Sequence, residues 1–230
     1  MASSSDAVER QSSADRRAVL TAVVSAIPRP EDHRRNVFVG IDGVDGSGKT
    51  MFADDIAELL APRHPAVRIS IDGFHRRRTE RYRRGRHSPE GFFLDSYDYA
   101  AFDRHVIAPL QAGPGPYLTA SHDLDSDELL DAPAHHLTAP SVIVVDGIFL
   151  HRRELRAVWD FSVFLRVDFA VSAARMARRD GSDPDPEAAS NRRYIEGQRI
   201  YLREDAPERH AAVIVENDDL EAPRIVGSGQ

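Results

Sequence analysis

Eight consecutive residues in the first quarter of the chain have the composition of a phosphate-binding loop. They read GVDGSGKT over positions 43–50 and satisfy the pattern GxxxxGK[ST]. Glycines let consecutive backbone N–H groups curl round phosphate oxygens, and a following helix presents its positive end to the same anion. Lys49 is expected to reach the β- and γ-phosphates of ATP, and the Thr50 hydroxyl to ligate Mg²⁺. The residues expected to hold the nucleotide are Gly43, Asp45, Gly46, Ser47, Gly48, Lys49 and Thr50.

The lysine of this loop is the only lysine in the chain, because every other long cationic side chain is arginine. A compact ammonium fits where a planar guanidinium would not, so Lys49 is expected to contact phosphate directly. An ordinary glycine-rich turn is the alternative interpretation. It does not require the strand and the helix that the pattern predicts on either side of the loop.

Two carboxylates end apolar runs and could complete a phosphoryl-transfer site. Asp146 closes the run VIVVD, where an acid beside a phosphate-binding loop would hold Mg²⁺ directly or through water. Asp72 follows another apolar run, ISI, and could accept the proton of an attacking hydroxyl. The alternative for both residues is an aspartate that ends a strand in a turn with the following glycine.

Arginines supply the remaining candidate cations. Arg175, Arg178 and Arg179 have the spacing of one helix face and could clamp the transferring phosphoryl group, or form a solvated face. The segment 76–87 contains seven arginines and one tyrosine, a composition that also suits a nucleic-acid backbone. Because the whole chain carries a net charge of −7, nucleic-acid binding is unlikely on composition, and a solvated charged loop or a flap over a bound substrate is favoured.

The elements that must position these residues follow from short apolar runs. We predict strands at 37–41, 67–71, 142–145, 161–167 and 212–215, with helical spacing at 16–27, at 51–60 and from about residue 171. Strands separated by helical or irregular crossovers indicate a parallel sheet with helices on both faces. The prediction is therefore an α/β, three-layer fold with a central five-stranded parallel sheet and a lid at about 172–190, with ligands at the carboxyl ends of the strands.

Length and composition indicate one domain. The 230 residues, 41% of them hydrophobic, suffice for one substantial core, which we place at 16–222 between a disordered N-terminal tail at 1–15 and a C-terminal tail at 223–230. The chain has no cysteine, which a reducing compartment permits. It shows no apolar secretory signal and no run of 18 apolar residues, so we expect a cytoplasmic protein without a membrane span.

With these motifs placed, residues 36–217 resemble the uridine kinase and phosphoribulokinase-like group of P-loop kinases. The resemblance rests on GVDGSGKT, IDGFH, LDSYD, YLTASH, VIVVDG and ARMARR. It implies a P-loop kinase fold in which Asp72 is the base, Asp95 binds ribose hydroxyls, and Tyr117 and His122 approach the nucleobase. It also implies that the lid arginines are Arg175, Arg178 and Arg179, that Asn217 lies near adenine, and that His75 contacts the acceptor.

The chain departs from this group at three places. Uridine kinases usually carry Asp-Ser-Phe-Tyr where this chain has DGFH at 72–75, a glutamate in place of Asp146, and a longer basic lid. These differences affect the acceptor side more than the phosphate side, since one lost base contact changes discrimination between substrates. The form DGFH also resembles sugar and pantothenate-type kinases.

The expected activity is therefore transfer of the γ-phosphoryl group of Mg²⁺-ATP to a hydroxyl of a small metabolite, with a nucleoside such as uridine as the first candidate. Sugars, pantothenate and nicotinamide riboside are alternative acceptors, and a nucleotide-dependent nucleic-acid-binding module is a further alternative. A regulatory GTPase is disfavoured, because its Asn-Lys-x-Asp segment would need a second lysine. The sequence permits a homo-oligomer and does not indicate one.

Overall fold

The computed structural model describes residues 4–229 and the side chains of residues 15–229. Its centre is a six-stranded sheet in the order β2-β5-β1-β6-β7-β8. The first five of these strands run parallel, and β8 pairs antiparallel with β7. The strands are β1 (Val37–Gly43), β2 (Ala66–Ser70), β5 (Val142–Gly147), β6 (Phe161–Arg166), β7 (Val213–Glu216) and β8 (Arg224–Gly227).

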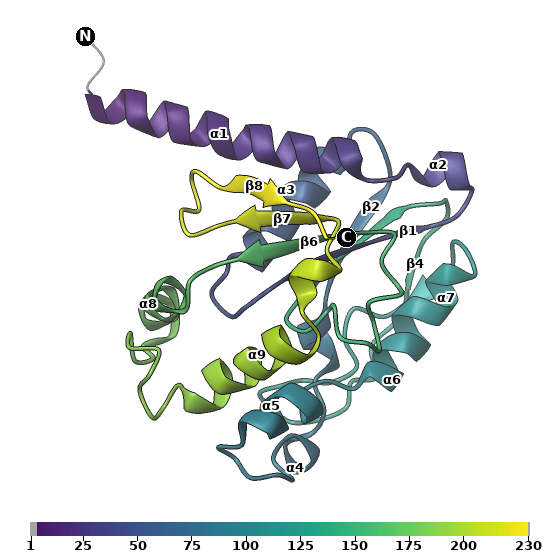
Figure 1. The fold of residues 1–230 in the computed structure, drawn as a ribbon. Helices are drawn as coiled ribbons and strands as arrows, with labels where there is room; N and C mark the ends of the chain where they lie inside the picture. The colour runs from purple at the N-terminus through teal and green to yellow at the C-terminus, as the bar shows by residue number, and fades with distance from the viewer. Residues whose placement is uncertain (1–3, 230) are drawn as a thin grey trace.

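Two layers of helices cover the sheet, as Figure 1 shows, with α1 on one side and α5, α6 and α9 on the other. The helices described are α1 (Ser4–Ala26), α2 (Pro30–His33), α3 (Lys49–Leu60), α4 (Arg78–Arg81), α5 (Pro89–Asp95), α6 (Tyr99–Phe102), α7 (Ala108–Gln111), α8 (Phe169–Asp180) and α9 (Arg192–Glu204). Short 3₁₀ turns η1 (Ile71–Phe74) and η3 (Pro207–Arg209) and a π-helical turn η2 (Asp103–Ile107) complete them.

The layers follow from alternation along buried strands. In β1, Val39 and Ile41 pack with α1 and α3, whereas Phe38 packs with the helices of the opposite face. In β5, Val144 and Val145 likewise belong to different faces. Successive side chains of a strand point to opposite faces, so strands buried on both sides read as continuous apolar runs.

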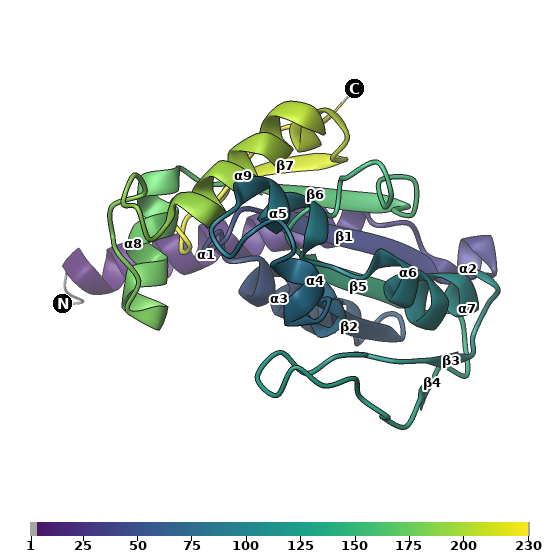
Figure 2. The same ribbon diagram turned by 90° about the horizontal axis from the view of Figure 1, so that it is seen from below.

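A long excursion from the main sheet carries the two-stranded antiparallel sheet of β3 (Pro116–Tyr117) and β4 (His135–His136). Figure 2 shows this excursion beside β2, at the edge of the main sheet. It is tied to the turn after β2, because Ser121 N donates to Gly73 O at 2.8 Å. The excursion therefore lies next to the carboxyl end of β2, where Asp72 is located.

The predicted α/β architecture is confirmed, with two differences at the chain ends. The sheet has a sixth, antiparallel strand, β8, in the segment expected to be a tail at 223–230. Its apolar part is only Ile225 and Val226, too short a run to identify from sequence. The first helix starts at Ser4 instead of residue 16, in the segment expected to be disordered, which contains no glycine or proline to stop a helix. Residues 1–3 of that segment lie outside the described residues.

Among the residues described, no helix combines the length and the apolar character that crossing a bilayer requires.

Packing beneath the helix that follows the phosphate-binding loop can be tested at Ile56. This side chain is fully buried between α3 and the sheet, so Ile56→Ala is expected to lower the free energy of unfolding by about 2–5 kcal/mol. Leu59, on the same helix, is only partly buried, so Leu59→Ala should cost clearly less. Urea unfolding followed by circular dichroism measures both, and equal losses would contradict the packing described.

Candidate active site

The loop between β1 and α3 has the backbone conformation that its sequence predicts. Gly46 and Gly48 adopt left-handed conformations, with φ of 67° and 88°. Residues with a Cβ rarely adopt this region, so glycine is required at both positions. α3 begins at Lys49, and its N-terminal end faces the loop. The carboxyl end of the central strand thus leads directly into an anion-binding turn.

Four successive carbonyl groups of this loop accept hydrogen bonds from side chains of the loop itself, of α8 and of the segment after β7. Lys49 Nζ donates to Val44 O at 2.8 Å, and Ser172 Oγ of α8 donates to Asp45 O at 2.5 Å. Arg175 Nη1 donates to the third carbonyl, that of Gly46, at 3.2 Å, and Asn217 Nδ2 to the fourth, Ser47 O, at 2.7 Å. Two amides of the same peptide groups are also bonded within the protein: Asp45 N donates to Gln198 Oε1 at 2.6 Å and Ser47 N to Val44 O at 3.1 Å.

The residues present fit a bound phosphate chain. Ser47 Oγ is buried and has no hydrogen-bond partner among the described residues, so a polar group inside the loop is available to a ligand. The left-handed glycines provide the close backbone approach that phosphate oxygens need. Asp45 is an exception to the prediction, because its N–H donates to Gln198 Oε1 at 2.6 Å and is not free for phosphate.

Two oxygen donors expected for Mg²⁺ lie together. Thr50 Oγ1 donates to Asp146 Oδ2 at 3.1 Å, which brings the first residues of α3 to the end of β5. Arg68 Nη2 of β2 lies 2.7 Å from Asp146 Oδ1. Burial raises the pKa of Asp146, and the Arg68 guanidinium opposes this effect. A hydroxyl beside a carboxylate is the kind of oxygen pair that Mg²⁺ prefers.

Asp72 lies at the carboxyl end of β2, in the turn η1, where the sequence placed it. Its side chain is exposed, and Tyr97 Oη donates to Asp72 Oδ1 at 2.7 Å. His75 Nδ1 lies 2.7 Å from Asp72 O, its ring packs on Tyr97 at 4.5 Å between centroids, and burial lowers its pKa. Burial and the negative charge of Asp72 raise the pKa of Tyr97, so its hydroxyl remains a donor. Tyr97 was not predicted, and only its place beside Asp95 in LDSYD hinted at it.

A cavity of about 430 Å³ opens next to Asp72 and the phosphate-binding loop. Asp45, Asp72 and His75 line its polar side, and α8 and α9 form its opposite wall. The apolar lining consists of Phe92, Ile148, Ala173, Met176, Tyr194 and Ile195. A concave, mostly apolar space with a few convergent polar groups is the usual form of a small-molecule site.

The three lid arginines do not act as one group. Arg175 donates to Asn217 O and Asp218 O, both at 2.8 Å, as well as to the loop. With Arg178 it lines a second cavity of about 680 Å³, between α8 and the segment that follows β7. Arg179 instead pairs with Asp180 at 2.6 Å, and this hydrogen bond raises its pKa, with smaller contributions from the cavity carboxylates.

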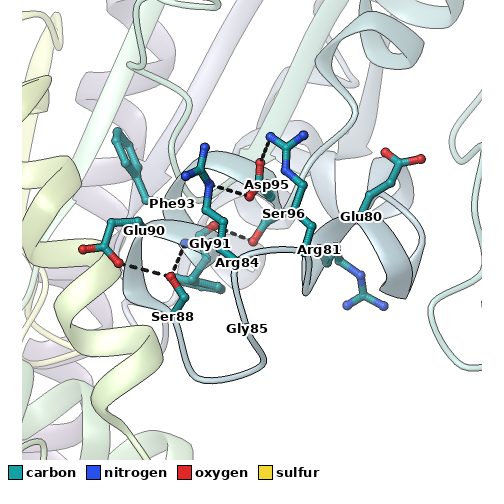
Figure 3. A network of polar contacts seen from close by, with 12 residues as sticks. Glu80, Arg81, Arg84, Gly85, Ser88, Glu90, Gly91, Phe93, Asp95 and Ser96 are labelled. Carbon is teal, nitrogen blue, oxygen red and sulfur yellow. Dashed lines mark hydrogen bonds and ion pairs between the residues drawn. The ribbon is translucent and has the colours of Figure 1, made fainter.

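The structure places Asp95 away from the cavity. The side chain is 1% exposed and pairs with Arg83 Nη2 at 2.5 Å and Arg84 Nε at 3.0 Å, as Figure 3 shows for Arg84. Asp95 is not among the residues that line the cavity. The resemblance assigned it to ribose hydroxyls, but in this conformation both carboxylate oxygens are taken by the arginine-rich segment.

Tyr117 and His122 were expected to approach the nucleobase, but they do not line the cavity. Tyr117 is buried in the hydrophobic core, and His122 Nε2 lies 3.1 Å from Asp127 Oδ1. The segment between them packs on Gly73, where an added Cβ would lie 2.4 Å from Thr119 O. The glycine that replaces the serine of the resembling kinases therefore permits this close approach.

Most of the remaining arginines between residues 76 and 87 are also paired within the protein. Arg76 Nε donates to Tyr97 O at 2.9 Å, Arg78 Nη2 to Asp125 O at 2.8 Å, and Arg81 lies 3.7 Å from Asp127. The segment therefore joins α5 to the excursion.

Asp42 has a role that the sequence pattern did not indicate. It is fully buried, accepts from Gly43 N at 2.7 Å and from Tyr201 Oη, and contacts His151 Nδ1 at 2.7 Å. Burial, together with the charge of Asp42, raises the pKa of Tyr201. The signal in the sequence was a carboxylate inside an apolar strand, immediately before the glycine-rich loop.

Comparison with solved structures shows that this is the P-loop kinase fold. The chain is similar to a possible uridine kinase from Bacillus stearothermophilus, with a TM-score of 0.64 and 22% identity over 87% of this chain and 97% of that one. It is also similar to phosphoribulokinase from Rhodobacter spheroides, with a TM-score of 0.55 and 13% identity over 80% and 70% of the two chains.

In sequence, the chain is 30% identical over 159 residues to the uridine kinase of Schizosaccharomyces pombe. The alignment covers 68% of this chain and 34% of the relative, so the match spans about a third of the relative's length. No family model matches the chain. By fold and by sequence similarity, the chain belongs to the uridine kinase and phosphoribulokinase-like group of P-loop kinases.

The placement of Asp95 predicts a structural role. Asp95→Asn weakens two charge-assisted hydrogen bonds of a buried carboxylate, so the free energy of unfolding should fall by about 1–3 kcal/mol in urea denaturation. An exposed aspartate of the excursion, Asp131, provides the control Asp131→Asn, for which little change is expected. Unchanged stability together with a raised KM for an acceptor would instead support contact between Asp95 and substrate.

Proposed function

We propose that this chain transfers the γ-phosphoryl group of ATP to a hydroxyl group of a small metabolite. The observation that carries the proposal is the cavity shared by Asp72 and the phosphate-binding loop, which places a carboxylate beside the predicted position of the terminal phosphate. Sequence similarity to a uridine kinase and a fold shared with phosphoribulokinase support the same class of reaction.

In this reaction the acceptor hydroxyl donates to Asp72, and its proton passes to that carboxylate as the new O–P bond forms. The bond from the γ-phosphorus to the bridging oxygen breaks, and ADP leaves. Tyr97 fixes the carboxylate by donating to Oδ1, which leaves Oδ2 for the acceptor. Alignment and charge neutralisation lower most of the barrier in phosphoryl transfer, so the proton transfer itself is a modest task.

Lys49 and the amides of the loop bind the phosphates in this proposal. Mg²⁺, held by Thr50 and Asp146, would neutralise the charge that develops on them. The second cavity, lined by Arg175 and Arg178 beside the segment after β7, is the proposed site of the adenine; Asn217 does not line it but directly precedes the lining residue Asp218. Arg179 is then the arginine nearest to the transferring group.

A nucleoside such as uridine is the first candidate acceptor, because the apolar wall contains Phe92 and Tyr194, whose rings pack edge to face at 5.0 Å between centroids. Aromatic and apolar side chains provide a surface for a flat base. Sugars, pantothenate and nicotinamide riboside remain alternative acceptors. The protein, acting on small molecules, would work in the cytoplasm.

Two substitutions test the proposed roles. Lys49→Ala should abolish ATP-dependent phosphorylation, because the loop loses its only cation. Asp72→Asn should lower kcat by about 10²-fold while leaving ATP binding nearly unchanged, since in this proposal its carboxylate contacts the acceptor and not the nucleotide. ADP release is measured with a panel of nucleosides and sugars, and ATP affinity by isothermal titration calorimetry.

The base assignment would be wrong if Asp72→Asn turned over at the wild-type rate. If no compound in the panel stimulates ADP release by the wild-type protein, while polynucleotides bind with steep salt dependence, the nucleic-acid-binding alternative would be supported instead.

A further inference from the structure

The polar side of the acceptor cavity is unusually acidic. Four aspartates line it, Asp45, Asp72, Asp180 and Asp183, and the only basic side chain in the lining is His75. No arginine or lysine is among these lining residues, all of which lie in the described part of the chain. Burial lowers the pKa of His75, which favours its neutral form.

The nearest cations lie outside this lining. Arg179 is engaged by Asp180, with its Nε and Nη2 at 2.6 and 2.9 Å from the two carboxylate oxygens. Lys49 Nζ donates to Val44 O at 2.8 Å. Burial raises the pKa of Asp45, and the charges of Lys49 and Arg179 oppose this effect. Asp183 Oδ1 accepts from a backbone amide at 2.9 Å. Asp45 and Asp72 are therefore left to face the acceptor.

Asp45 is held in place by its neighbours on two helices. Gln198, 1% exposed on α9, accepts from Asp45 N at 2.6 Å and donates through Nε2 to Asp45 Oδ2 at 3.3 Å. Ser172 of α8 donates to the Asp45 carbonyl at 2.5 Å. The other carboxylate oxygen, Oδ1, receives no hydrogen bond from the described residues, although Asp45 lines the cavity. A carboxylate that two helices hold in place thus lines the space that the substrate would fill.

We infer that Asp45 determines acceptor specificity: it binds a second hydroxyl of an acceptor that carries no phosphate or carboxylate group. The inference rests on the proposed kinase function and narrows its substrate class to uncharged polyhydroxy compounds. Asp72 would take the proton of the hydroxyl that is phosphorylated, and Asp45 would accept a hydrogen bond from a neighbouring hydroxyl. A nucleoside or a free sugar has this arrangement of donors.

Electrostatics explains the exclusion of acids. An anionic acceptor would bring its charge next to Asp45 and Asp72, with no guanidinium or ammonium among the side chains that line the cavity, and burying an unpaired charge is costly. An uncharged hydroxyl instead donates to a carboxylate, and hydrogen bonds to charged groups are about twice as strong as neutral ones. The same cavity therefore rejects one class of acceptor and binds the other.

Matched pairs of acceptors test the charge rule with the full-length wild-type protein. The pairs are uridine and orotidine, panthenol and pantothenate, and ribulose and ribulose 5-phosphate. In each pair the first compound is uncharged and the second carries an acidic group. We expect the protein to phosphorylate only the uncharged members. For each uncharged compound that is a substrate, kcat/KM should exceed that of its acidic partner by at least about 100-fold, the ratio that 2.7 kcal/mol produces.

The role of Asp45 is tested by Asp45→Asn, with Glu58→Gln as the charge-matched control on the exposed side of α3. For the best uncharged acceptor, Asp45→Asn should raise KM by about tenfold and change kcat less, because one hydrogen bond to a charged oxygen becomes a neutral one. In the same variant, the ratio of kcat/KM between an uncharged acceptor and its acidic partner should be smaller than in the wild-type protein. Glu58→Gln should change neither value.

The outcomes separate the inference from the proposed function. Preferential phosphorylation of an acidic partner, or an unchanged acceptor KM in Asp45→Asn, would overturn the inference and leave a kinase. A wild-type protein that phosphorylates no member of the panel and no wider library would overturn the proposed function, and the inference with it. A rise in the KM for ATP alone in Asp45→Asn would assign Asp45 to the nucleotide and also overturn the inference.

Discussion

The site depends on the orientation of four peptide groups between Val44 and Ser47. Their carbonyl oxygens are bound by one lysine of the loop itself and by side chains of α8 and of the segment after β7. Because α8, α9 and the segment after β7 bind the backbone of this loop, distant elements fix its conformation. A buried donor without a partner costs about 1–3 kcal/mol, which makes each of these contacts a constraint on the sequence.

This dependence explains the placement of the arginines on α8. A cation that binds the outer surface of the loop cannot simultaneously reach the transferring phosphoryl group. Arg175 binds the outer surface of the loop, because it donates to Gly46 O and to the segment after β7. Arg179, one turn further along α8, interacts instead with the carboxylates of the cavity. Helical spacing predicts which residues share a face, but not which ligand that face meets.

The nucleotide half of the site could be predicted from sequence because its residues are contiguous. A loop of eight residues, flanked by a strand and a helix, defines its own geometry, and Asp72 and Asp146 follow from strand ends that meet at one sheet edge. The parallel sheet and its two helical layers follow from the same apolar runs. These runs do not predict the order of the strands, nor β8 or the early start of α1, since neither of these two elements has a long apolar pattern.

The acceptor half was harder to predict because its residues take their roles from distant partners. Asp95 matched a motif, but its partners Arg83 and Arg84 lie 12 and 11 residues earlier and withdraw its carboxylate from the cavity. Asp45 was expected to serve the phosphates, but Gln198, 153 residues later, holds its amide. Several arginines of the segment 76–87 are likewise engaged by distant partners, which include Asp95 and Asp127.

Helix α9 contacts the phosphate-binding loop and the residue before it. Tyr201 binds Asp42, and Gln198, one turn earlier on the same helix, binds Asp45. Near the start of α9, Arg193 donates to Arg86 O and Ser88 O at 3.1 and 3.2 Å, in the turn that leads into α5. The same helix also lines the cavity through Tyr194, Ile195 and Gln198. A rotation of α9 that widened the cavity would therefore also break its contacts with Asp42 and Asp45.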